Sequence, residues 1–364
     1  MSKVERYKGL VAPKKSDGDA FLLGQLPPTT TVQSRLPVAP PVGVIIPNHN
    51  CEHFVREAIQ SVAAQSITNF RAVIVDDAST DGSVRTIRGV LDEIGDDRFS
   101  LLELKTNVGQ CGAIRQGLAR LNAPFVAVLD SDDFWYENFL ERHLAAHLNS
   151  RHPVALTYCN SHIVDGAGHL LAGGAWWFDQ SAVAEGETNL DVNDVPRIDG
   201  TGRALYPTGA RLRLYRRWQP NWSSNTMAAM MVRRAFLDLV LVSPDDQLRL
   251  YVDFYLSSFA ALLTGVISID EQLYAYRVHG ANKHSDGIVA GGRYSSSSRE
   301  WAPIQEAVLG QVLAVMEGNG ATLSSVFGSG HVQDAARLLR KSLKNAPARS
   351  GRGAMRVLQS LFRA

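Results

Sequence analysis

The feature that most constrains the fold is a series of short apolar runs that alternate with helix-like segments between Val42 and Leu129. Four runs have the length and composition of buried strands, at residues 42–46, 72–75, 99–104 and 125–129. Between them, apolar residues recur at helical spacing, as in Phe54, Ala58 and Val62. Strands that alternate with helices predict an α/β fold, with a mostly parallel sheet covered by helices on both faces.

The chain on either side of this region has a different character. Residues 1–41 are rich in proline and have few apolar stretches, which predicts an extended N-terminal arm. Residues 42–160 would form the first half of the domain and residues 161–290 the second, with an insertion at 165–220. Residues 291–364 are predicted to be a helical, basic extension that either packs on the domain or contacts an anionic membrane surface.

Composition argues against several classes of protein. The 364 residues carry a formal net charge of +1, whereas nucleic-acid binding usually needs a dense basic face. Three widely spaced cysteines supply neither a disulfide framework nor a thiolate zinc site, and they fit a reducing cytoplasm. No run approaches the roughly 20 apolar residues that cross a bilayer, and the N-terminus is too polar for a signal peptide. We therefore expect a cytoplasmic protein, with any membrane contact peripheral.

Acidic residues crowd the carboxyl ends of the predicted strands, where ligands bind in parallel α/β sheets. Asp130, Ser131, Asp132 and Asp133 directly follow the fourth strand. Three neighbouring carboxylates repel one another and need a cation, and oxygen ligands without a thiolate favour Mg²⁺ or Mn²⁺. Such an ion would neutralise the charge that develops on a diphosphate leaving group. A solvated turn that only caps the next helix is the alternative.

A second acidic pair, Asp76-Asp77, closes the second strand. A carboxylate at this position can accept the ring N–H of a uracil. Asp81 is better interpreted as the cap of the following helix. For Asp77 the functional interpretation is favoured, because a second adjacent acid has no obvious capping task.

The order of these segments resembles the family 2 inverting nucleotide-sugar glycosyltransferases. The strongest likeness, over residues 42–135, lies in IIPNHNCEHFVREAIQSVAAQSITNFRAVIVDDASTDGS, NVGQCGAIRQG and VLDSDDFW; it extends to about Ser285 through VDFYLSSFAALLTG and LYAYRVHGANKHS. The resemblance implies a GT-A fold, a nucleotide-sugar donor (a UDP-sugar favoured), Mn²⁺ or Mg²⁺, and a carbohydrate acceptor. The first half would then bind the donor and the second half the acceptor, and a homodimer is possible.

Carried over by position, the resemblance assigns roles to single residues. Asp132 or Asp133 would be the direct metal ligand. His279 would reach the metal or the diphosphate late in the fold, and a loop histidine with its hydrogen bonds satisfied locally is the alternative. Asp253 would be the general base that deprotonates the acceptor hydroxyl. Donor binding would involve Pro47, Asn48, Asn50, Asp77, Asn107, Gly109, Arg115, Asp130, Ser131 and Asp132, with Pro47 and Asp77 at the nucleobase.

Three departures from the family pattern bear on these assignments. Asn48-His49-Asn50 replaces the usual Tyr-Asn, Gln116 replaces the usual Asn after Arg115, and Val252 replaces the acid that commonly precedes the base. Asp253 still lies in an apolar segment, where an ionised carboxylate is costly unless it is paired or catalytic. An exposed acid on one helix face is the alternative.

Candidate acceptor contacts come from the second half. The flat rings of Trp176, Trp177 and Trp222 suit the apolar faces of sugars, and core packing is the alternative for each of them and for Trp218. Arg277 would either neutralise a phosphate or pair with an acid.

Competing classes lack their own signatures. The first strand–helix turn has no glycine, against a dinucleotide-binding oxidoreductase, and no P-loop motif occurs. A sugar-nucleotide nucleotidyltransferase and a non-catalytic glycosyltransferase-like scaffold remain as alternatives. The sequence therefore predicts a metal-dependent, inverting glycosyltransferase that works in cell-surface polysaccharide or glycoconjugate synthesis.

Overall fold

The structure is a computed structural model of the chain. It describes residues 40–150, 152–175, 197–198, 204–205, 212–219, 224–241, 248–249, 251–279, 282 and 298–345. Most of the predicted N-terminal arm, and the candidate acceptor residues Trp176, Trp177 and Trp222, lie outside the described residues.

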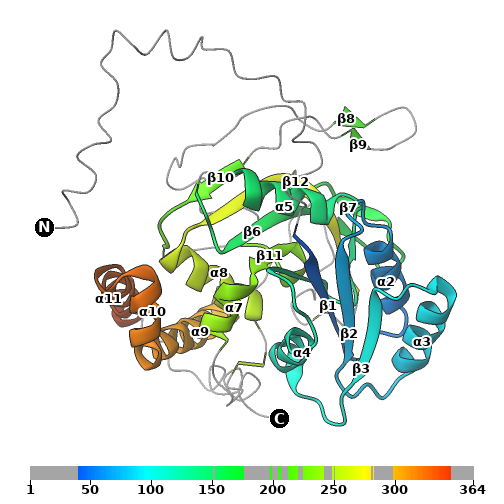
Figure 1. Ribbon diagram of the computed structural model, residues 1–364, viewed down its shortest axis with the longest axis horizontal. Coiled ribbons are helices and arrows are strands. Elements are labelled where there is room, and N and C mark those ends of the chain that lie inside the picture. The colour runs from blue at the N-terminus through cyan, green and yellow to red at the C-terminus, as the bar shows by residue number, and fades with distance from the viewer. Residues whose placement is uncertain are drawn as a thin grey trace, which may run out of the picture. The chain divides into compact units, whose positions relative to one another are not determined.

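The four strands predicted in the first half form one parallel block of the sheet (Figure 1). Strand β1 lies between β4 and β2, and β3 pairs with the far side of β2. The bounds are Val42–Asn48 for β1, Phe70–Asp76 for β2, Phe99–Glu103 for β3 and Phe125–Val128 for β4. Every residue of β1 is buried, as the uninterrupted apolar run predicts for a central parallel strand.

The second half extends the same sheet with mixed pairing. The sheet order is β10-β12-β6-β11-β4-β1-β2-β3; β11 is antiparallel to both β4 and β6, and β12 is parallel to β6. The bounds are Leu156–Val164 for β6, Leu212–Tyr215 for β10, Met230–Arg233 for β11 and Val266–Arg277 for β12; the short strands are β5 (Phe134–Trp135), β7 (Leu170–Ala172), β8 (Arg197–Ile198) and β9 (Ala204–Leu205). Strand β10 falls within the predicted insertion but is an edge strand of the main sheet.

Helices cover both faces of the sheet, as predicted. On one face α2 (Val55–Ala63), α3 (Ser83–Ile94) and α5 (Phe139–Asn149) contribute buried residues to the cluster that contains Val42, Val44 and Ile46. On the other face α4 (Gly109–Leu118), α7 (Arg234–Val240) and α8 (Val252–Leu263) contribute buried residues to the cluster that contains Ile45. The alternation of β1 side chains between the two clusters is the period-two pattern of a strand. A 3₁₀ turn, η3 (Met227–Ala229), leads into β11.

The C-terminal helices belong to the same core. The helices α9 (Ser298–Gly318), α10 (Gly320–Phe327) and α11 (Ser329–Asn345) contribute Val312, Leu323 and Leu339 to the cluster that contains α8. The helical extension is thus confirmed. Of the two predicted tasks, packing on the domain and membrane contact, α11 shows packing on the domain. Membrane contact of its basic face stays a prediction, and residues 355–362 lie outside the described residues. Among the helices described here, none is both long and apolar enough to cross a membrane.

Candidate active site

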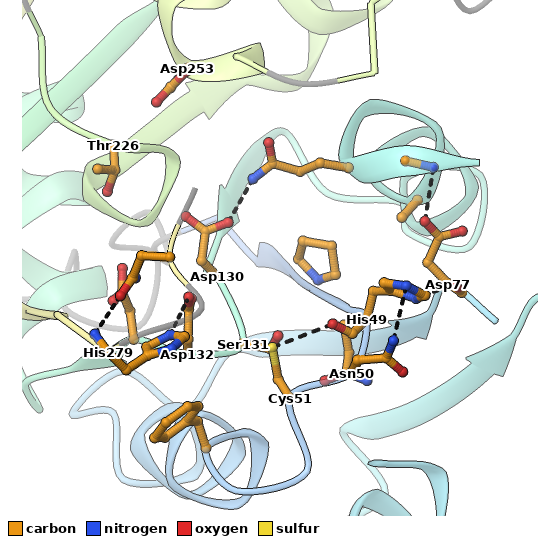
Figure 2. Close-up of a pocket in the computed structure, with 18 of the residues that line it drawn as sticks. His49, Asn50, Cys51, Asp77, Asp130, Ser131, Asp132, Thr226, Asp253 and His279 are labelled. Atoms are coloured by element: carbon orange, nitrogen blue, oxygen red, sulfur yellow. Dashed lines mark hydrogen bonds and ion pairs between the residues drawn. The ribbon is translucent and has the colours of Figure 1, made fainter. Parts of the chain in front are cut away.

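The carboxyl ends of β1, β2 and β4 open onto a cavity of about 770 Å³. Most of the residues predicted to bind a donor line it, although they come from four separate strand ends, and the predicted base Asp253 reaches it from α8. The lining includes Pro47, Asn48, Asn50, Asp77, Asn107, Gly109, Asp130, Ser131, Asp132, Asp133, Asp253 and His279. Figure 2 shows Asp77 on one side of the view and Asp253 and Thr226 on the other, with Asp130 between them.

The acidic turn after β4 brings three carboxylates into a largely desolvated place. Burial is the main cause that raises the pKa of Asp130 to about 7, and the charges of Asp132 and Asp253 raise it further. Gln110 opposes this shift by donating a 2.7 Å hydrogen bond from Nε2 to Asp130 Oδ1. Burial and the neighbouring carboxylates also raise the pKa of Asp133 well above its usual range. The turn therefore concentrates negative charge whose compensation is incomplete.

Asp132 and His279 meet in this cavity although 147 residues separate them in sequence. His279 Nε2 lies 3.2 Å from Asp132 Oδ2. The imidazole also packs on the ring of Phe54, with 4.6 Å between the ring centres. The backbone N–H of His279 donates to the Asn282 side chain, which fixes the turn after β12. A carboxylate oxygen and a ring nitrogen thus lie within hydrogen-bonding distance of each other in the cavity, and their role as metal ligands stays a prediction.

Asp77 has a structural task that sequence reasoning missed. Its Oδ1 accepts a 2.7 Å hydrogen bond from Val108 N, and its Oδ2 accepts a 2.8 Å bond from Gly109 N. The carboxylate therefore holds the first amides of α4 from a neighbouring strand, where a negative charge also complements the helix dipole. The premise that this second acid has no capping task is wrong. The predicted cap, Asp81, stands one residue before the N-cap position of α3, which is Gly82, and its Oδ1 accepts a 2.9 Å bond from Ser83 N, the first amide of the helix.

Asn48 and Asn50 shape the turn that follows β1. Asn48 Nδ2 donates to Asp76 Oδ1 at 2.8 Å, and its own Oδ1 is buried with no hydrogen-bond partner. Asn50 has a left-handed backbone with φ of 56°, which asparagine tolerates better than most residues. Its Oδ1 accepts a 2.8 Å bond from Thr80 N, so Asn50 joins two strand-end turns.

Asp253 stands in the first turn of α8 and lines the cavity from its other side. Desolvation raises the pKa of this carboxyl to about 6, against a weak opposing effect of the 2.7 Å hydrogen bond from Phe254 N to Oδ1. A carboxylate with a pKa near the working pH is suited to accept and release a proton. The alternative of a freely exposed acid is wrong, because Asp253 is largely withdrawn from water.

Two arginines predicted at the site do not line the cavity. Arg115 projects from α4 toward Tyr255, whose ionisation it affects, and is absent from the lining. Arg277, predicted as an acceptor contact, is 2% exposed and pairs with Glu57. The sequence left two interpretations of Arg277, neutralising a phosphate or pairing with an acid, and the structure shows the pairing with an acid. Trp218 is 3% exposed in the core, as the packing alternative predicted.

Several lining residues escaped sequence reasoning. Gln110 contacts Asp130 as described above, and Thr226 joins a network through the Tyr274 hydroxyl, 2.9 Å from its Oγ1. Arg249 donates from Nη2 to Asn107 Oδ1 at 2.6 Å and packs over Gly109. Of these three residues, only Gln110 could have been found from the sequence, because it lies within the NVGQCGAIRQG motif. The other two come from segments whose sequence has no pattern of its own.

The family profile described as glycosyl transferase family 2 matches residues 43–239, more than half of the chain. The chain belongs to glycosyl transferase family 2. The matched region ends before Asp253 and His279, so the roles of these two residues stay predictions.

Relatives agree with this membership. An uncharacterised glycosyltransferase of Nostoc is 28% identical over 71% of this chain and 71% of its own length. The teichuronic acid biosynthesis glycosyltransferase TuaG of Bacillus subtilis is 38% identical over 29% of this chain and 41% of its own. The Escherichia coli enzyme WfgD, named as a UDP-Glc:α-D-GlcNAc-diphosphoundecaprenol β-1,3-glucosyltransferase, is 32% identical over 34% and 47%. The chain thus spans less than half the length of the latter two.

A solved structure confirms the predicted GT-A fold. TarS residues 1–349 of S. aureus, crystallised with UDP-GlcNAc, superpose with a TM-score of 0.51 at 16% identity, over 85% of this chain and 74% of that chain. At this identity the likeness concerns the fold alone.

Proposed function

We propose that this family 2 glycosyltransferase moves a sugar from a nucleoside diphosphate sugar to an acceptor hydroxyl, with inversion at the sugar carbon. The observation that carries the proposal is one cavity that is lined both by the Asp132–His279 pair and by Asp253 from another part of the chain. The pair suits the charged leaving group, and Asp253 suits the nucleophile.

The donor nucleotide would lie along the turns after β1, β2 and β4. Asn48 Oδ1 is a buried acceptor without a partner, and Arg249 presents a guanidinium over Gly109. The carboxylate of Asp77 uses both oxygens on α4 amides, but each oxygen keeps a second lone pair for a nucleobase N–H. We favour a UDP-sugar, because the relative WfgD is named for UDP-Glc.

The acidic turn fits Mn²⁺ or Mg²⁺. Asp133 Oδ2 is buried with no hydrogen-bond partner, and the Asp132–His279 pair supplies an oxygen and a nitrogen within 3.2 Å of each other. Over the described part of the chain, no group of three or more His, Cys, Asp or Glu side chains is arranged to hold a metal. Ions such as Mg²⁺ often bind through one or two carboxylates together with substrate phosphates and water, so two side chains suffice. When bound, the ion would neutralise the charge that develops on the departing diphosphate.

Asp253 would take the proton from the acceptor hydroxyl as that oxygen attacks the sugar carbon. Inversion in a single displacement needs one base on the face opposite the leaving group. We propose Asp253 for this task, because it lies at the N-terminus of α8, across the cavity from Asp77 (Figure 2). The proton ends on Asp253, and the electron pair of the broken glycosidic bond leaves with the diphosphate.

The acceptor is proposed from relatives and not from the site. TuaG is named for teichuronic acid biosynthesis and WfgD for a diphosphoundecaprenol-linked sugar. We therefore propose a glycan or lipid-linked glycan acceptor in cell-surface polysaccharide synthesis, which would place the chain in the cytoplasm or on the inner face of the membrane.

Calorimetry with UDP, GDP and dTDP, each with and without Mn²⁺, tests the donor assignment. The proposal expects UDP to bind most tightly, and at least tenfold more tightly with Mn²⁺ than in EDTA. Binding of none of the three diphosphates would favour the non-catalytic scaffold. Release of pyrophosphate from a sugar phosphate and a nucleoside triphosphate would instead identify a nucleotidyltransferase.

A further inference from the structure

Arg277 is the largest side chain that the structure buries almost completely, and it lies beside the acidic turn without lining the cavity. Its guanidinium reaches from the end of β12 to several other segments. Nε donates to the Asp132 carbonyl at 2.9 Å, Nη1 donates to the Gly166 carbonyl at 3.0 Å, and Nη2 donates to Glu57 on α2. The backbone N–H of Arg277 also donates to Asp133 Oδ1 at 2.8 Å. One residue thus ties the acidic turn to α2 and to the turn between β6 and β7.

Two aromatic rings fix the plane of this guanidinium. Its central carbon lies 5.1 Å from the ring centre of Phe54 and 5.2 Å from that of Phe134. Phe54 also packs on His279, two residues beyond Arg277. The Phe54 ring therefore couples the position of the Arg277 guanidinium to that of the His279 imidazole. The hydrogen bond to the Asp132 carbonyl couples the same guanidinium to Asp132, whose carboxylate contacts His279.

The side-chain hydrogen bonds of Arg277 go to groups other than the carboxylates of the turn, although its positive charge partly offsets the raised pKa of Asp133. Its side chain contacts the Asp132 backbone carbonyl, and its counter-ion is Glu57, whose side chain is half exposed. The bond to Asp133 comes from the backbone and leaves Oδ2 of that carboxylate without a partner. A guanidinium that paired with Asp132 or Asp133 would instead compete with a bound cation for the same oxygens.

From these contacts we infer that Arg277 is the positioning residue of the metal site, and that Glu57 is its dedicated counter-ion. Arg277 holds the Asp132 backbone and the His279 turn in the arrangement that receives a divalent cation with a diphosphate. Glu57 balances the guanidinium, so that the carboxylates of the turn stay available. This inference rests on the proposed function. It assigns a role in metal binding to Arg277 and Glu57, which lie outside the cavity.

Arg277→Lys tests the inference, because lysine keeps the charge but loses the planar fork that reaches three segments at once. The chain offers a matched control in Arg142→Lys. Arg142 on α5 pairs at 3.0 Å with the buried Glu271, on the same strand as Arg277, and neither residue lines the cavity. The measurements are Mn²⁺ affinity by electron paramagnetic resonance at saturating UDP, UDP affinity in EDTA, and thermal unfolding.

We expect Arg277→Lys to weaken Mn²⁺ binding by about 10- to 100-fold, the usual cost of losing a residue that orients a metal ligand, with UDP affinity in EDTA unchanged. Arg142→Lys should leave the Mn²⁺ affinity within about twofold of wild type, whatever it does to thermal stability. Glu57→Gln, which keeps Arg277, should weaken Mn²⁺ binding by about threefold or more and unfold normally.

Wild-type Mn²⁺ affinity in both Arg277→Lys and Glu57→Gln would overturn the inference while the proposed function stood. An equal loss in Arg142→Lys would also overturn it, because general loosening of β12 would then explain the effect. If the wild-type chain binds no Mn²⁺ with UDP, the proposed function itself fails, and the inference falls with it.

Discussion

Asp253→Asn tests the proposed base by a substitution that keeps the local fold. The Asn side chain has nearly the same shape, and its carbonyl oxygen can still accept the 2.7 Å bond that Phe254 N now donates to Oδ1. The change therefore removes the proton acceptor and the charge while it keeps the local geometry. Loss of a general base typically costs 10²- to 10⁴-fold in rate, which corresponds to about 3–5 kcal/mol in the activation free energy.

The same substitution should stabilise the fold. Burial raises the pKa of Asp253 from 3.8 to about 6, so its ionisation at neutral pH opposes folding. The linkage sign is that of an acid with a raised pKa: the penalty is absent below the unfolded pKa and grows as pH rises past it. Removing the charge should therefore increase stability at pH 7 by on the order of 1–3 kcal/mol. Stabilisation with loss of turnover is the trade-off expected of a catalytic group in a desolvated place.

The assay measures UDP release with a donor and acceptor that the wild type uses, together with thermal unfolding of both proteins. The control is Asp92→Asn, an exposed acid on α3 that does not line the cavity. We expect kcat to fall at least about 100-fold in Asp253→Asn, with donor KM unchanged and a higher Tm. Wild-type kcat should itself rise about tenfold from pH 5 to pH 7, as a carboxyl with a pKa of about 6 loses its proton. Asp253→Asn turnover within threefold of wild type would refute the assignment of the base.

Two further predictions concern folding and the donor pocket. Gly109→Ala should destabilise the chain by about 1–2 kcal/mol in urea unfolding and weaken UDP binding in calorimetry. The reason is that Gly109 has φ of 78° and that an added Cβ would lie 3.0 Å from Arg249 Cβ. Unchanged stability and affinity would contradict the packing argument. Burial lowers the pKa of His147 to about 3. As pH falls below about 6.5, the unfolded chain therefore protonates this imidazole while the folded chain keeps it neutral. From pH 7.5 to 5.5 the wild type should therefore lose about 1.4 kcal/mol more stability than His147→Gln, and equal losses in denaturant titrations would show that this ring titrates normally when folded.

The sequence determined the first half of the fold because local patterns decide it. The run from Val42 to Ile46 reads as a buried strand in isolation, and the helical spacing around Ala58 needs no partner to be recognised. No comparable sequence pattern predicts that β11 pairs with β4 and β6, or that β10 pairs with β12. Both are four-residue strands whose places depend on which neighbours they meet, 70 or more residues away for β11 and β6 and more than 50 for β10 and β12.

The same distinction applies to the site. The position of Asp77 and Asp132 directly after strong strands can be predicted, and both residues line the cavity, while their roles stay predictions. Their partners could not be predicted, because Asp77 caps α4 from 31 residues away and Arg277 reaches Glu57 across 220 residues. A carboxylate next to another carboxylate has no visible capping task in a linear sequence, yet the sheet brings the amides of another turn to it. Arg249 illustrates the converse, since nothing in its surrounding sequence indicates that it covers Gly109.

The central claim is that the acidic turn and Asp253 together transfer a sugar from a nucleotide donor. A panel of UDP-sugars with glycan and lipid-linked acceptors, read by product mass spectrometry with Mn²⁺ or with EDTA, tests it most directly in the wild type and in Asp132→Ala. The account predicts a glycosylated product from the wild type with Mn²⁺, none in EDTA, and none from a folded Asp132→Ala protein. Full activity in EDTA, or in Asp132→Ala, would contradict it.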